Sequence, residues 1–146
     1  MATDTSASPS ARPSLLRHLP TVARLLLGMV FFGAGLAGLL MPTPAVTSPP
    51  MPEGLVAFVN GLVRSGYLLP LLKVTETVVG VLLLTNRFVP LALTLLAPLV
   101  VNIVAVHLFL ERSGLPVAAV ILILHLYLAW TYREVFRPML APRVTP

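Results

Sequence analysis

The stretch LLPLLKVTETVVGVLLL, residues 68–84, is almost entirely apolar, yet it carries Lys73 and Glu76. An apolar run of this length predicts a helix that crosses a membrane. Side chains three residues apart share one face of a helix, so the ammonium and the carboxylate can meet. A single charge in lipid costs roughly 2.5–3.5 kcal/mol, so we expect the pair to face neighbouring helices.

The composition of the whole chain is that of an integral membrane protein. Of its 146 residues, 57% are hydrophobic and only 10% are charged, whereas soluble domains carry roughly a quarter charged residues. The net charge of +5 does not come from a basic run interleaved with aromatic residues, so we expect no nucleic-acid partner. The chain has no cysteine, which excludes disulfides, thiolate metal ligands and cysteine-ligated clusters, and we expect no metal site.

Four apolar runs predict four transmembrane helices. Each has roughly 18–22 residues, which at 1.5 Å per residue crosses an apolar layer of about 30 Å. The predicted crossings are Thr21–Met41, Tyr67–Thr85, Val89–Leu110 and Leu115–Tyr132. Strands of a membrane barrel would alternate polar and apolar residues, and these runs do not. The predicted fold is therefore an all-α, four-helix transmembrane bundle.

Residues 21–140 form the predicted membrane domain, between a mostly mobile tail at 1–20 and a short C-terminal tail at 141–146. A signal peptide is the alternative interpretation of the first run, because arginines precede it. Its length is that of a full crossing, however, and no A-x-A cleavage site closes it, so we favour an uncleaved helix.

The arginines predict that both termini lie on the inner side of a cell inner membrane. That side would hold Arg12, Arg17, Arg24, Arg87, Arg133, Arg137 and Arg143, and the outer side only Arg64 and Arg112. Positively charged residues are enriched in loops on the cytoplasmic side. Trp130, with Tyr127 and Tyr132 beside it, fits an aromatic belt at the inner end of the fourth helix.

The outer connection between the first two helices has a proline-rich part, PTPAVTSPPMP, which should run extended. The following segment, EGLVAFVNGLVRSG, has the spacing of a short amphipathic helix at the membrane interface or in the mouth of the bundle. A helical lead-in to the second crossing is the alternative. In the first helix, Gly33 with Ala37 and Ala34 with Gly38 form small-xxx-small pairs, which serve packing within the bundle or dimerisation.

Helical rise predicts a polar layer in the outer half of the bundle. Glu76, Asn102 and His125 fall roughly 12–15 Å below the outer boundary, and Lys73 and His107 roughly 5–10 Å below it. If all five face inward, they form a candidate ligand-binding or polar-core site. The layer could be structural, could bind the polar head of a lipophilic molecule such as a quinone, or could serve transport or assembly.

Other chemistry has little support in the sequence. His107 and His125 differ by roughly 8–10 Å in depth at the helical rise, which disfavours a haem held between them. Glu111, four residues after His107, predicts an ordinary ion pair or hydrogen bond instead. The usual hydrolytic and phosphoryl-transfer motifs do not occur, so catalytic residues stay unknown and enzymatic activity stays open.

The chain resembles the DoxX family of small four-helix membrane proteins over about residues 22–140. The resemblance rests on Lys-x-x-Glu followed by Gly-x-Leu-Leu-Leu, then on Asn-Arg-Phe-Val-Pro-Leu-Ala-Leu. Ala-Pro, Asn-Ile, His-Leu-Phe-Leu and Gly-Leu-Pro follow in order. In the family, Lys73, Glu76, Asn102 and His107 stand at characteristic polar positions. Relatives often have Asn-Lys where this chain has Ala37 and Gly38.

This resemblance implies a small membrane subunit linked to quinone and redox metabolism, with a pocket around Lys73 and Glu76. A quinone is the only cofactor that it suggests. Expected partners are the lipid bilayer and a membrane redox complex or further copies of the chain. The alternative is a non-enzymatic scaffold or assembly partner in which the Lys–Glu pair is structural.

Overall fold

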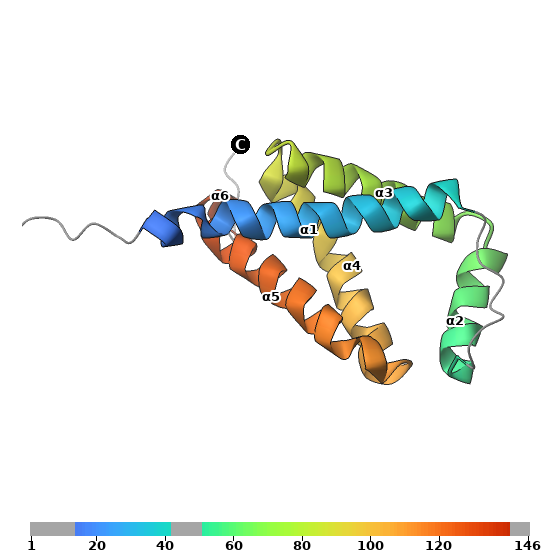
Figure 1. The fold of residues 1–146 in the computed structure, drawn as a ribbon. Helices are drawn as coiled ribbons and strands as arrows, with labels where there is room; N and C mark the ends of the chain where they lie inside the picture. The colour runs from blue at the N-terminus through green and yellow to red at the C-terminus, as the bar shows by residue number, and fades with distance from the viewer. Residues whose placement is uncertain (1–13, 42–50, 141–146) are drawn as a thin grey trace, which may run out of the picture.

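The computed structural model describes residues 14–41 and 51–140, and in these two ranges the chain is helical apart from short turns and contains no strand. The helices are α1 (Ser14–Leu40), α2 (Glu53–Arg64), α3 (Leu68–Leu84), α4 (Val89–Phe109), α5 (Leu115–Thr131) and α6 (Arg133–Phe136), with 3₁₀ turns η1 (Arg112–Gly114) and η2 (Arg137–Leu140) (Figure 1). The all-helical prediction is confirmed. The prolines at 42–50, the tail 141–146 and residues 1–13 lie outside the described residues.

The first helix begins earlier than expected. Residues 14–20 were predicted to belong to a tail, but α1 starts at Ser14 and includes Pro20. Pro20 is the seventh residue of α1 and lies beyond the first amides, which have no partner within the helix, so it removes one backbone hydrogen bond without ending the helix. The helix thus begins seven residues before the predicted start of the crossing at Thr21, while the segment long and apolar enough to cross a membrane is His18–Leu40.

The later helices lie where the apolar runs predicted them, within one or two residues at each end. Three segments are long and apolar enough to cross a membrane: His18–Leu40, Val89–Phe109 and Arg112–Thr131. Helix α3 reaches that length only together with α2, from which it is bent by 91°. The described part of the chain thus contains three to four helices that could span a membrane.

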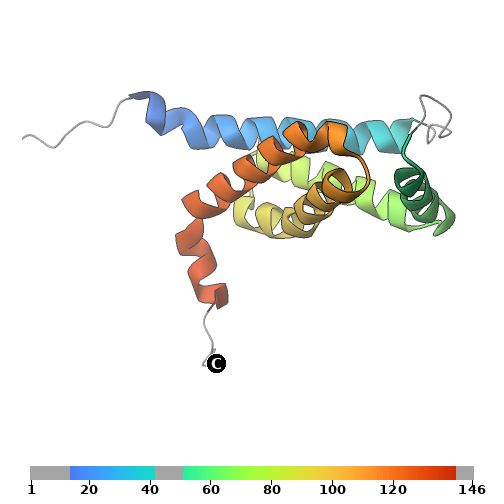
Figure 2. The same ribbon diagram turned by 90° about the horizontal axis from the view of Figure 1, so that it is seen from below.

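Two helix pairs build the molecule. Helix α1 runs antiparallel along α3, and α4 with α5 forms a second antiparallel pair that diverges from the first (Figures 1 and 2). Buried leucines, valines and aromatic residues fill the region where the pairs meet. They include Leu27, Phe31, Val79, Leu83, Leu93, Leu96, Ile121 and Leu128. The core therefore lies at the crossing of the two pairs.

The link from α3 to α4 is a tight reversal at residues 85–88. Asn86 and Phe88 both adopt left-handed backbone angles, with φ of 56° and 51°. Two backbone hydrogen bonds, from Asn86 to Leu83 and from Arg87 to Leu82, close the end of α3. Asparagine tolerates this conformation better than most residues, which suits the turn.

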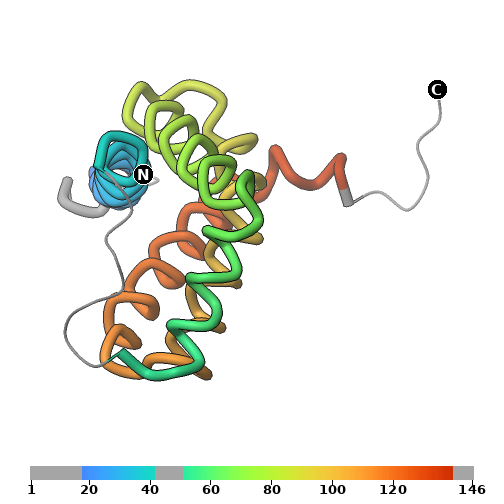
Figure 3. The backbone as a smooth tube through the Cα atoms, turned by 90° about the vertical axis from the view of Figure 1, so that its right-hand side faces the viewer, coloured from blue at the N-terminus to red at the C-terminus, as the bar shows by residue number. Residues whose placement is uncertain are grey.

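Helix α2 forms where the spacing of apolar residues predicted a helix, and it is bent by 91° from α3. It turns away from α3 towards the side on which the α4–α5 loop lies (Figure 3). A Cβ atom at Gly54 would lie 3.1 Å from Leu110 Cδ2, so the start of α2 lies against the end of α4. Its glycine permits this close approach.

Candidate functional site

Lys73 and Glu76 form the ion pair that their spacing predicts. The distance from Lys73 Nζ to Glu76 Oε2 is 2.7 Å. The glutamate side chain is only 8% exposed and that of the lysine 21% exposed. Both charges are thus sheltered by protein, which reduces the free-energy cost of holding them in an apolar environment.

Glycines of α1 lie against α3 beside Lys73. A Cβ atom at Gly38 would lie 2.8 Å from Lys73 Cε, so the lysine stem crosses the helix at that glycine. A Cβ at Gly35 would lie 2.5 Å from the backbone nitrogen and Oγ1 of Thr77. On the other helix, Gly80 approaches the backbone of Phe32. The close contact between α1 and α3 therefore depends on glycine, which has no side chain, at these positions.

Only some of the small residues that the sequence paired on the first helix pack against α3. Gly38 packs on α3, but Gly33 has no atom within 4 Å of where its Cβ would be, and both Gly33 and Ala37 are exposed. The face that packs on α3 carries Gly28, Gly35 and Gly38 instead. Close approach of α1 and α3 thus explains these three glycines, and it leaves Gly33 unexplained.

Arg24 has a role that sequence reasoning missed, since the sequence placed it only among the arginines of the inner side. It is buried and donates hydrogen bonds to the backbone oxygens of Leu83 and, at 3.3 Å, Leu84. These carbonyls end α3, where backbone acceptors lack partners and the helix dipole is negative. The sequence feature that could have indicated this role is an arginine within an apolar run, at the level where another predicted helix ends.

The predicted shared polar layer does not form. Asn102 is exposed on α4, so the expectation that it faces inward beside Glu76 is wrong. Within the described ranges no hydrogen bond or ion pair joins Asn102 or His125 to the Lys73–Glu76 pair. Helix rise predicted the depth of these residues, but the rotation of α4 about its axis directs the amide away from the interior.

His107 organises the loop between α4 and α5, as its spacing to Glu111 predicted. His107 Nδ1 lies 3.1 Å from the backbone oxygen of Glu111 and 3.3 Å from its Oε2. The Glu111 carboxylate also accepts hydrogen bonds from the backbone nitrogens of Ser113, at 2.7 Å, and Gly114, at 3.1 Å. These bonds, chiefly those from Ser113, hold the pKa of Glu111 below its ordinary value. His107 is therefore part of a loop structure.

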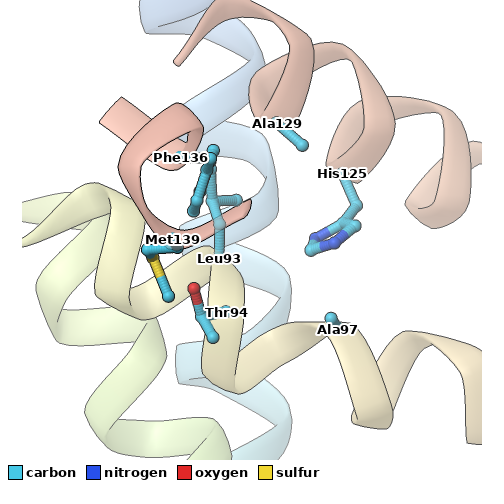
Figure 4. A pocket seen from close by; sticks show the side chains of 7 residues that line it. All are labelled: Leu93, Thr94, Ala97, His125, Ala129, Phe136 and Met139. Carbon is cyan, nitrogen blue, oxygen red and sulfur yellow. The ribbon is translucent and has the colours of Figure 1, made fainter. Parts of the chain in front are cut away.

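His125 lines an apolar pocket between α4, α5 and the C-terminal segment (Figure 4). The pocket has a volume of about 290 Å³ and is lined by Leu93, Thr94, Ala97, His125, Ala129, Phe136 and Met139. A second apolar pocket, of about 270 Å³, lies between α1 and α5. Neither Lys73 nor Glu76 lines either of them. Nothing in the sequence marked Phe136 and Met139 as neighbours of α4.

The five predicted site residues therefore fall into separate places: an ion pair, an exposed amide, a loop histidine and a pocket histidine. In residues 14–41 and 51–140, no three His, Asp or Glu side chains are grouped so that they could hold a metal ion. Comparison of the chain with protein-family models, curated proteins and solved structures found no match.

Proposed function

We propose that the chain is a DoxX-like protein of the cell inner membrane that crosses the bilayer four times as a helix bundle, with both termini inside. Three helices have the length and hydropathy of a crossing, and α3 adds 17 residues, or about 25 Å at the helical rise. The excess of arginines on the side of the termini supports this orientation. The sheltered ion pair on α3 is also what a helix in lipid requires.

Single cysteines test the orientation, because the natural chain has none. Thr85→Cys lies at the α3–α4 turn and Ser113→Cys at the α4–α5 loop, both at exposed positions. In intact spheroplasts, a membrane-impermeant maleimide should label Ser113→Cys and should label Thr85→Cys only after permeabilisation. The reverse pattern would show the opposite orientation, and labelling of both from outside would contradict four crossings.

For its role, the geometry best supports a non-enzymatic scaffold or assembly partner in which the Lys–Glu pair is structural. The observation that carries this proposal is the burial of the Glu76 carboxylate at 2.7 Å from Lys73 Nζ, with the Lys73 stem against Gly38 of α1. Each charge is paired with the other, and the lysine stem lies in the contact between α1 and α3. Such a pair fixes which face of α3 meets α1.

The test compares Lys73→Met, Glu76→Gln and the double variant. A structural pair predicts that each single variant lowers the free energy of unfolding by roughly 3 kcal/mol, because one buried charge loses its partner. The double variant should recover most of that loss, since no unpaired charge remains. Glu134→Gln is the matched control, because Glu134 pairs with Arg137 at the same spacing on an exposed surface. Its effect should stay below about 1 kcal/mol.

A Glu76→Gln protein that is as stable as the wild type would refute the structural role. The same result accompanied by loss of a bound lipophilic molecule would favour the second candidate, a quinone-linked redox subunit. One observation favours that candidate: the Lys73 side chain is 21% exposed, so part of it is accessible to a ligand.

Extraction of the protein in native nanodiscs tests this second candidate. A quinone-linked subunit should carry a co-purifying quinone, and Lys73→Met should lose it. If no quinone co-purifies and added ubiquinone and menaquinone do not bind, the quinone proposal fails.

A further inference from the structure

The pocket between α4 and α5 contains one polar group whose hydrogen bonding is incomplete. His125 is only 7% exposed, and its Nδ1 has no hydrogen-bond partner among the described residues. A buried nitrogen without a partner destabilises a protein by roughly 1–3 kcal/mol. The great majority of buried polar groups in proteins have a hydrogen-bond partner, so this nitrogen requires an explanation.

The imidazole points into the pocket from α5 (Figure 4). Rotation about the Cβ–Cγ bond of histidine is broad, so a small turn of the ring brings the nitrogen to face a molecule bound there. The walls around it are otherwise apolar: Leu93, Ala97 and Ala129 from the two helices, with the two C-terminal side chains. Thr94, the other polar residue among the described wall residues, already donates its hydroxyl hydrogen to the Pro90 backbone oxygen at 3.0 Å.

We propose that this pocket binds a neutral, lipophilic alcohol or phenol taken up from the membrane, with its hydroxyl group hydrogen-bonded to His125. The ligand is neutral because none of the described residues that line the pocket carries a charge. A hydroxyl both donates and accepts, so it satisfies either tautomer of a neutral imidazole. The volume of about 290 Å³ lies at the lower end of small-molecule pockets, so it suits one ring system or a short chain.

The pocket between α1 and α5 provides an internal comparison. Its volume, about 270 Å³, is nearly the same, but its walls expose no polar surface. Such a groove offers a lipid chain only dispersion contacts and nothing that selects a hydroxyl group. The proposal therefore applies to the His125 pocket alone and is independent of the role of Lys73 and Glu76.

The experiment uses two probes of the same ring shape, 2-naphthol and naphthalene, with the full chain in nanodiscs. Equilibrium dialysis, with empty nanodiscs subtracted, gives the affinity of each probe. His125→Phe keeps an aromatic ring and removes both nitrogens, while His18→Phe makes the same change at an exposed position on α1. We expect His125→Phe to weaken 2-naphthol binding roughly 2- to 12-fold, the equivalent of one hydrogen bond. Naphthalene binding should not weaken, and His18→Phe should match the wild type for both probes.

A second pair of variants removes volume instead of hydrogen bonding. Ala129→Leu fills the pocket and should reduce binding of both probes, whereas Ala119→Leu makes the same change at an exposed position of α5 outside the pocket and should not.

Histidine labelled with ¹⁵N adds a direct readout, because 2-naphthol should shift the His125 ring resonance and naphthalene should leave it nearly unchanged. The proposal is overturned if His125→Phe and Ala129→Leu both bind 2-naphthol as tightly as the wild type, or if the His125 resonance does not respond. Either result would mean that lipid chains alone occupy the pocket.

Discussion

The packing of α1 on α3 can be tested with two glycines that differ only in their surroundings. A Cβ atom at Gly80 would lie 2.6 Å from the Cα and 2.7 Å from the Cβ of Phe32, and it would also meet that residue's backbone nitrogen. At Gly33, by contrast, a Cβ would have no atom within 4 Å. Gly80→Ala and Gly33→Ala are therefore a crowded variant and its matched control.

The magnitude follows from the distance by which the two backbones must separate. Ordinary van der Waals contact begins at 3.4 Å, so the approach of 2.6 Å must open by 3.4 − 2.6, or about 0.8 Å. Backbone atoms of Phe32 cannot rotate aside as a flexible side chain can. Overpacking of this kind destabilises by roughly 1–3 kcal/mol. Because α3 is the helix on which α1 lies along its length, we expect a value in the upper half of that range.

Both variants gain the same helix propensity, up to about 1 kcal/mol for glycine to alanine, so the difference between them isolates the crowding. The assay is the free energy of unfolding in mixed micelles titrated with SDS, with helical content followed by circular dichroism. Gly80→Ala should be less stable than Gly33→Ala by roughly 2–3 kcal/mol. If the two variants are equally stable, the close approach of α1 and α3 is not the contact that holds them together.

Two further predictions concern the ends of helices. Arg24→Met removes the donor to the carbonyls of Leu83 and Leu84, and should lower the free energy of unfolding by roughly 1.5–3 kcal/mol. The exposed control Arg87→Met should stay within about 0.5 kcal/mol of wild type, and equal effects would contradict the assigned role. Because the pKa of Glu111 is lowered in the folded state, its stabilisation is present above the ordinary glutamate pKa and disappears as the pH falls through the lowered value. Glu111→Gln should therefore lose less stability than wild type on acidification, and parallel curves of unfolding free energy against pH would refute this.

Local features of the site were accessible from the sequence because they involve residues close together in the chain. Lys73 meets Glu76 three residues on, as helical geometry requires. His107 meets Glu111 four residues on, although Glu111 lies just beyond the end of α4. The helix positions were also accessible, since an apolar run long enough to cross a bilayer is a local property of the chain. The start of α1 was missed because Pro20 was taken to lie outside the helix.

The sequence by itself therefore determined the positions of the later apolar helices, the contacts between side chains close together in the chain, and the position of each polar residue along its helix. Only the tertiary structure decided how each helix is rotated. Helices α4 and α5 are apolar on nearly every side, so no hydrophobic face indicates which side chains point inward. The rotation of these helices exposes Asn102 and directs His125 into a pocket lined by the C-terminal segment, and the rotation of α1 turns Gly35 rather than Gly33 towards α3.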